Sequence, residues 1–194
     1  MSAQSNLVNL QLLNKGKLSE RLIEMGFGDF ETLAEWVKHL PYQRISDRSN
    51  FELIITENRG TCSSKHAFLK SLAIEQGWSD ITLYIGIYRM NGNNTRGVGS
   101  ILSKVGIDFI PEAHCYLKYK GNRIDFTHPD LNVLNVEDEI MKEILIQPEQ
   151  VGFYKEALHK RFIEDWLQKE KVGYSLDFIW RIREQCIQQL VEHL

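Results

Sequence analysis

The sequence is short of cysteine, of long apolar runs and of an apolar leader. It has three cysteines in 194 residues; they form no CxxC pair, and an odd number cannot all pair within one chain. No segment reaches the roughly 18 apolar residues that a membrane helix needs, and residues 1–9 are too polar for the core of a signal peptide. We therefore expect reduced thiols and a cytoplasmic protein without a membrane partner.

An excess of charge of one sign is also missing. With 23 Lys and Arg against 26 Asp and Glu, the formal net charge is -3, and there is no long basic run. Such a chain has no general attraction for nucleic acid, so a peptide, a protein or a small molecule is the expected partner. A content of 43% hydrophobic and 25% charged residues fits one domain over residues 1–194 with a substantial core.

Apolar residues at helical spacing predict two helices near the N-terminus, over residues 18–27 and 30–40. Asp29 is the expected N-cap of the second helix, and Pro41 ends it. Residues 51–55 form a short apolar run that fits either a strand or a buried turn of helix.

The middle of the chain predicts a helix followed by β-structure. A helix is expected from Thr61 to a Gly77 C-cap, and residues 81–88 alternate as a strand buried on one side. The Gly- and Asn-rich residues 91–100 predict a loop. Two β-prone runs, 113–119 and 123–127, flank Gly121-Asn122, which we interpret as a hairpin turn.

The C-terminal part, residues 148–194, predicts a pair of helices separated by Val172 to Ser175. Each helix has an apolar stripe that we expect to pack on the rest of the protein. The stripe residues are Tyr154, Leu158, Phe162, Ile163 and Trp166 in the first helix, and Leu176, Ile179, Ile187, Leu190 and Leu194 in the second.

Cys62 is the main candidate for chemistry because it lies in the first turn of a predicted helix. A helix N-terminus lowers the pKa of a thiol and so favours the nucleophilic thiolate. Lys65 and His66 follow at spacings that place them over the same helix face as Cys62. Cys115 and Cys186 are interpreted as buried thiols without a chemical role.

A base and an acid follow the cysteine in the order used by Cys-His-Asp enzymes. His114 on the predicted strand could accept the thiol proton, and Asp125 or Asp130 could orient its imidazole. A turn at Gly121-Asn122 would place Asp125 opposite Lys118, four residues or about 13 Å from His114. That register favours Asp130, so both acids remain candidates.

Residues 59–62 (Arg-Gly-Thr-Cys), 113–116 (Ala-His-Cys-Tyr) and 124–127 (Ile-Asp-Phe-Thr) resemble the transglutaminase-like, papain-related superfamily. The resemblance covers about residues 35–130. It implies an α+β fold in which the nucleophile helix packs on an antiparallel sheet, flanked by N-terminal and C-terminal helices. It also implies Cys62 as nucleophile, His114 as base and Asp125 as orienting acid.

The expected activity is acyl transfer from an amide or ester through a thioester, with no cofactor. The backbone N–H of Cys62 would be one oxyanion donor, and Gln43 a second. A narrower resemblance is to arylamine N-acetyltransferases, through Arg59, Gly60 and Cys62. The alternatives are a transglutaminase-like binding module without activity, and a metal site using Cys62 and His66 with His114 and Cys115 as further donors.

Overall fold

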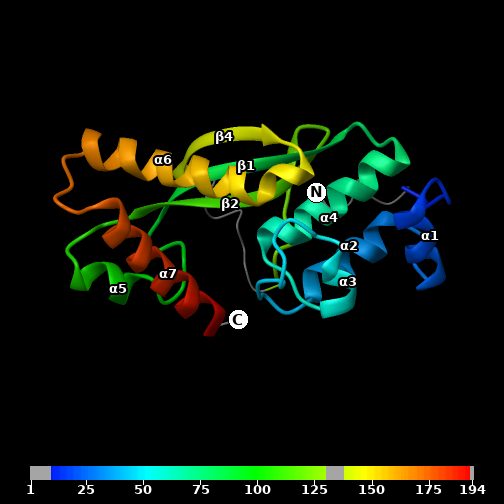
Figure 1. Ribbon diagram of the computed structural model, residues 1–194, viewed down its shortest axis with the longest axis horizontal. Helices are drawn as coiled ribbons and strands as arrows, with labels where there is room; N and C mark the ends of the chain where they lie inside the picture. Colours follow the sequence, from blue (N-terminus) through cyan, green and yellow to red (C-terminus); the bar gives the residue numbers. More distant parts are fainter. Residues whose placement is uncertain (1–9, 130–137, 193–194) are drawn as a thin grey trace. The chain divides into compact units, whose positions relative to one another are not determined.

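The computed structural model describes residues 10–129 and 138–192, and in this part of the chain it is an α+β protein. Seven α-helices accompany a four-stranded antiparallel sheet with the strand order β3-β2-β1-β4 (Figure 1). The α+β class expected from the sequence is confirmed. The helices are α1 Lys17–Glu24, α2 Phe30–His39, α3 Leu53–Glu57, α4 Cys62–Gln76, α5 Gly99–Lys104, α6 Phe153–Lys169 and α7 Leu176–Glu192. The strands are β1 Ile81–Met90, β2 Ile110–Tyr119, β3 Asn122–Ile124 and β4 Ile140–Ile146.

The described chain divides into two compact units. The first contains residues 10–84, 115–129 and 145–151, and the second contains residues 85–114, 138–144 and 152–192. Strands β1, β2 and β4 each contribute residues to both units. That the chain forms one domain stays a prediction.

Helix α4 is the centre of the first unit. Helices α1, α2 and α3 and the short 3-10 helix Pro148–Val151 all contact it (Figure 1). The predicted caps are confirmed, since Asp29 accepts a hydrogen bond from the Thr32 backbone N–H, and Gly77 ends α4 with a φ of 76°. Residues 51–55, left open between strand and helix, lie in the turn that leads into α3 and in its first residues.

Helix α4 is buried on more faces than its apolar spacing indicates. Besides Phe68, Leu72 and other apolar side chains, it buries Lys65, His66 and Lys70. A helix that is covered on most sides must satisfy its polar groups inside the protein. Lys70 does so by donating to the Ile81 carbonyl oxygen at 2.6 Å.

Strand β1 confirms the clearest β-prediction. The alternating residues Ile81, Leu83, Ile85 and Ile87 are all fully buried. On the other face, Thr82 and Tyr84 are partly buried, and the residues from Gly86 onward are buried. The predicted burial on one side is therefore found only in the first half of the strand. Helix α5 begins inside the expected loop 91–100, and neither α5 nor β4 was predicted.

The predicted hairpin turn at Gly121-Asn122 is wrong. Strands β2 and β3 pair with Tyr119 opposite Asn122 and Leu117 opposite Ile124, so the turn residues are Lys120 and Gly121. Their φ angles are 48° and 83°. A two-residue type I′ turn needs positive φ at both positions, and glycine is suited to the second of them here.

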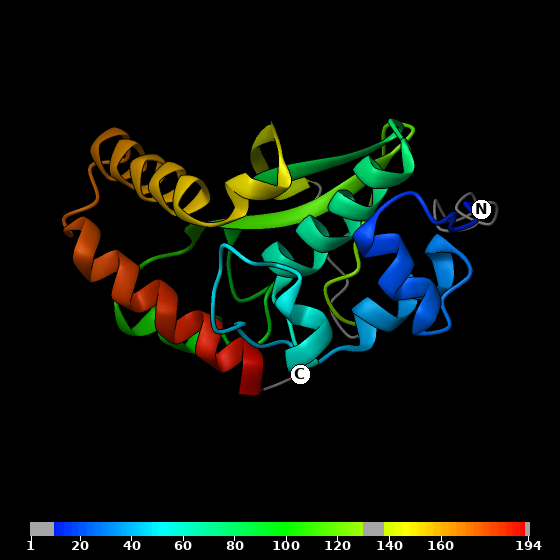
Figure 2. The same cartoon turned by 45° about the vertical axis from the view of Figure 1, so that its right-hand side comes forward.

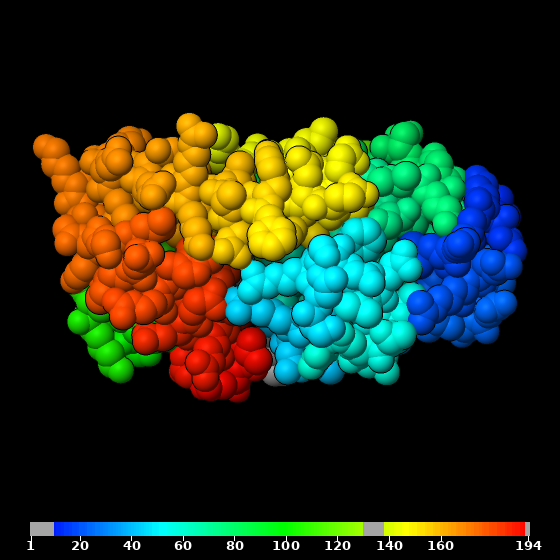
Figure 3. Space-filling model, viewed as in Figure 1, coloured from blue at the N-terminus to red at the C-terminus, as the bar shows by residue number. Residues whose placement is uncertain are grey.

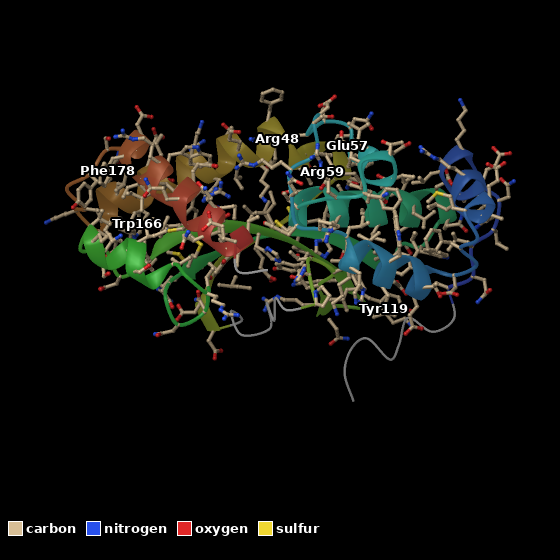
Figure 4. All side chains as sticks on the ribbon, turned by 90° about the horizontal axis from the view of Figure 1, so that it is seen from below. Arg48, Glu57, Arg59, Tyr119, Trp166 and Phe178 are labelled. Atoms are coloured by element: carbon tan, nitrogen blue, oxygen red, sulfur yellow. The ribbon has the colours of Figure 1, made fainter. Side chains whose placement is uncertain are left out.

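The second unit has its own apolar core, to which α5, α6, α7 and parts of the sheet contribute. It includes Met90, Ile110, Ile163, Trp166, Ile179 and Cys186. Helices α6 and α7 pack on each other, as Figure 2 shows, and Figure 4 marks Trp166 and Phe178 on them. The α6 stripe is partly wrong, because Tyr154 is 44% exposed, whereas His159 and Leu167 are buried.

No helix in the described residues is both long enough and apolar enough to cross a membrane.

Candidate functional site

Cys62 is the first residue of α4, a helix of 15 residues. The residue is 6% exposed, and it takes part in no disulfide. At this position the sulfur lies at the positive end of the helix dipole, which favours a thiolate over a thiol. The predicted helix start is therefore confirmed as the setting of the candidate nucleophile.

The turn before Cys62 is fixed by hydrogen bonds. The Ser64 hydroxyl accepts from the Thr61 backbone N–H at 3.0 Å, which satisfies a donor at the start of the helix. Two residues earlier, Arg59 donates two hydrogen bonds to Glu57 at 2.6 and 2.9 Å. Figure 4 labels both side chains.

Glu57 also connects this turn to the segment that follows α2. It accepts from the Ser46 hydroxyl and from the Ser46 backbone N–H, at 3.1 Å for the nearer contact. These Ser46 hydrogen bonds and those of Arg59 hold the pKa of Glu57 below its ordinary value. The cyan surface of Figure 3 includes this part of the chain, on the outside of the first unit.

Gln43 lies beside the same turn. Its backbone N–H donates to the Gly60 carbonyl oxygen at 3.2 Å, and Tyr42 forms a parallel bridge with Gly60. Gln43 thus lies next to a residue two positions before Cys62. Because its backbone N–H is used by Gly60, only the exposed side-chain amide is available as an oxyanion donor.

Lys65 is fully buried one helical turn after Cys62. Its ammonium group donates to the carbonyl oxygens of Leu40 and Thr127 at 2.6 Å each, and of Lys38 at 3.2 Å. Burial lowers the pKa of Lys65 to about 8, while the negative charges of Asp125 and Cys62 act in the opposite direction.

His66 is also fully buried, and backbone groups occupy both of its ring nitrogens. Nε2 accepts from the Phe126 N–H at 2.8 Å, so Nδ1 carries the proton and donates to the Cys62 carbonyl oxygen at 2.8 Å. A ring bound in this way has no lone pair left to act as a base or a metal ligand. His66 joins the start of α4 to the segment after β3.

Asp125 lies in that segment, directly after β3. One carboxylate oxygen accepts from the Thr127 N–H at 2.7 Å and lies 3.6 Å from Nε2 of His66. The structure therefore brings Asp125 together with Lys65 and His66 at the start of α4. The rival acid, Asp130, lies outside the described residues.

His114 is partly buried on β2. It is the last residue of β2 that belongs to the second unit, and Cys115 is the first that belongs to the first unit. Cys115 is fully buried, and its sulfur lies 3.7 Å from the Ser63 hydroxyl, which itself lies 3.9 Å from the Cys62 sulfur. That Cys115 and Ser63 pack next to the candidate nucleophile was not predicted. Both thiols thus border one serine.

A metal centre finds no support in the described residues, where no three Cys, His, Asp or Glu side chains gather in a way that could hold an ion. The engagement of both His66 nitrogens explains why the Cys62 and His66 pair does not provide such a centre.

Sequence reasoning missed what Lys65 and His66 do. Their spacing indicated side chains above Cys62, but not that they would bind backbone groups of residues 38–40 and 126–127. The available signal was the pair Lys65-His66, which follows the cysteine closely and precedes the apolar residues Ala67 to Leu69.

No protein-family model, curated protein or solved structure matches this chain.

Proposed function

We propose that the protein is a cysteine-dependent acyl-transfer enzyme with a transglutaminase-like core, in which Cys62, His114 and Asp125 form the triad. The observation that carries this proposal is the position of Cys62 as the first residue of α4, one turn before a buried lysine. A helix dipole and a nearby cation both favour the thiolate form of a cysteine. The substrate would be an amide or ester of a peptide, a protein or a small molecule.

The reaction would proceed through a thioester. The Cys62 sulfur attacks the carbonyl carbon, and the imidazolium of His114, which has taken the thiol proton, returns it to the leaving amine or alcohol. Water or an amine then attacks the thioester carbon and releases the Cys62 thiolate, while His114 takes the proton of the attacking group. Each step leaves the enzyme in the state in which the next one starts.

The negative charge on the substrate oxygen needs preplaced donors. We assign these to the backbone N–H of Cys62 and the side-chain amide of Gln43. Support for Gln43 comes from its hydrogen bond to Gly60, which keeps it beside the turn that carries the nucleophile.

Strand β3 ends at Ile124, opposite Leu117, so Asp125 follows the hairpin and is not part of the strand. Support for Asp125 as the acid comes from its place near Lys65 and His66 at the start of α4, the helix that carries Cys62.

An activated ester such as p-nitrophenyl acetate tests the proposal. Wild-type protein is expected to release p-nitrophenolate and to carry an acetyl group on Cys62, detected by peptide mass spectrometry. The Cys62→Ser variant should lose the thioester, and His114→Gln should slow its formation by about 10²- to 10⁴-fold, the usual contribution of a general base.

Cys115→Ser is the matched control, because this thiol is buried near Ser63 but is not assigned a reaction. It should keep the acetylation rate. If Cys62→Ser releases p-nitrophenolate as fast as wild type, the thiol is not the nucleophile, and a binding module without activity becomes the better account.

A further inference from the structure

The ammonium group of Lys65 lies where three chain segments meet. One is α4 itself, the second contributes the carbonyl oxygens of Lys38 and Leu40 at the end of α2, and the third contributes that of Thr127 after β3. A lysine ammonium has three N–H donors, and here three carbonyl oxygens accept them. This set of partners offsets part of the cost of burying the charge completely.

One of these contacts leads directly to the candidate acid. Thr127 accepts from Lys65 through its carbonyl oxygen, and its N–H donates to the Asp125 carboxylate at 2.7 Å. The Thr127 hydroxyl is buried without a hydrogen-bond partner among the described residues. The backbone of Thr127, and not its side chain, therefore connects the lysine to Asp125.

A second line of evidence connects Lys65 to the nucleophile. The two residues are three apart on α4, a spacing that places them on the same helix face. The turn before Cys62 also packs on the lysine, because a Cβ atom added at Gly60 would lie 2.9 Å from Cγ of Lys65. Glycine thus allows the Arg59-to-Cys62 turn to approach the lysine stem.

The positive charge of Lys65 and the negative charges of Asp125 and Cys62 stabilise one another. Burial lowers the pKa of Lys65, and the charges of Asp125 and Cys62 raise it again in part. An interaction that stabilises the ammonium stabilises the thiolate and the carboxylate to the same extent.

We propose that Lys65 is a positioning residue of the Cys62 site: it holds the Asp125 segment against α4 and provides the buried positive charge that favours the Cys62 thiolate. The inference rests on the proposed function, because it assigns Lys65 to the same reaction. Lys65 itself does not touch the substrate.

Lys70 on the same helix provides a matched comparison. It is 9% exposed and donates to one carbonyl oxygen, that of Ile81 at 2.6 Å. Burial alone lowers its pKa, with no contribution from Cys62 or Asp125. Lys70 is thus a buried lysine of α4 with a purely structural set of contacts.

The pH profile of Cys62 alkylation by iodoacetamide tests the inference in wild type, Lys65→Met and Lys70→Met, with circular dichroism to confirm folding. Lys65→Met should shift the midpoint upward by about one pH unit or more, because removing a buried opposite charge disfavours the thiolate. Lys70→Met should leave the midpoint unchanged. Equal midpoints in all three proteins would overturn the inference.

A reciprocal measurement covers the case in which Lys65→Met does not fold. NMR titration of the Lys65 amine in wild type and Cys62→Ser should show a lower midpoint in the variant, because the thiolate charge is gone. An unchanged midpoint would reject the coupling. Wild-type Cys62 that reacts no faster than free cysteine would instead reject the proposed function, while the midpoint differences would still decide the role of Lys65.

Discussion

Lys65 and His66 are consecutive buried polar residues, yet the structure gives them different tasks. The Lys65 ammonium binds carbonyl oxygens from two other segments and is coupled to the charges of Asp125 and Cys62. The His66 ring bridges the Cys62 carbonyl oxygen and the Phe126 N–H and is thereby fixed in one neutral tautomer. The lysine thus provides a positive charge at the site, whereas the histidine links two backbone segments of it.

The structural role of His66 predicts a large loss of stability in His66→Ala. The change leaves the buried Phe126 N–H without its acceptor and removes a packed ring, so the free energy of unfolding should fall by about 2 kcal/mol or more. Denaturant unfolding measures this. His39→Ala is the control, since His39 is exposed and bonds only within its helix; a change above about 0.5 kcal/mol there would not be expected.

In the second unit, Arg183 and Glu112 form a buried ion pair. Two hydrogen bonds of 2.6 and 2.7 Å join them, and His159 on α6 lies 4.0 Å from the same carboxylate. Arg183→Met should lower the free energy of unfolding at pH 7 by about 3–5 kcal/mol, because Glu112 is left as an unpaired buried charge. The double variant Glu112→Gln, Arg183→Met should recover part of the loss; no recovery would contradict this explanation.

The same pair predicts how stability depends on pH. Burial disfavours ionisation of Glu112, but the charge and hydrogen bonds of Arg183 outweigh it and lower the pKa of Glu112 from 4.5 to about 2. This contribution to stability is complete above about pH 4.5 and is lost as the pH falls towards 2. Wild type should therefore lose about 3 kcal/mol relative to the double variant over this range. If the free energies of unfolding of wild type and the double variant changed with pH in parallel, ionisation of Glu112 would not be coupled to folding.

The β2–β3 hairpin depends on the two-residue turn Lys120-Gly121, in which the lysine is unfavourable and the glycine is well suited. Lys120 has a φ of 48°, which costs a residue with a Cβ atom about 1 kcal/mol, whereas Gly121 takes its φ of 83° without that cost. Gly121→Ala should lower the free energy of unfolding by about 1 kcal/mol. Lys120→Asn should raise it by about 0.5 kcal/mol, since Asn-Gly suits a type I′ turn. A gain in stability for Gly121→Ala and a loss for Lys120→Asn would mean that another turn forms.

The elements that the sequence predicted well are those with local signals. Asp29 and Gly77 cap their helices as expected, and the alternation of residues 81–88 is a property of the strand itself. Strand β4 carries no such signal, because Ile140–Ile146 is only partly buried and does not alternate. The hairpin register failed because both Lys120-Gly121 and Gly121-Asn122 are possible turns, and only strand pairing decides between them.

The candidate site was predictable only in part, because local signals reveal some of its residues but not their contacts. A cysteine at a helix start is visible in the sequence, as is the order of His114 and Asp125. The contacts that surround Cys62 join residues far apart in the chain, such as Lys65 with Thr127 and Ser63 with Cys115. Periodicity and capping patterns contain no information about such pairs.

Across the molecule, the three cysteines differ in their position in the fold and in their burial. Cys62 begins a helix, Cys115 is buried on β2, and Cys186 lies in the core of the second unit, where burial raises its pKa to about 11. A thiol with a raised pKa and no access to solvent reacts slowly. The native protein therefore contains two internal controls for the reactivity of Cys62.

The rate of Cys62 alkylation by iodoacetamide at pH 7 shows whether Cys62 is an activated nucleophile, with peptide mass spectrometry to assign the labelled residue. A free cysteine with a pKa of about 8.5 is only a few per cent thiolate at this pH. We expect native Cys62 to be labelled several-fold faster than free cysteine, while Cys115 and Cys186 stay unlabelled until the protein unfolds. Labelling of Cys62 at or below the rate of free cysteine would contradict this expectation.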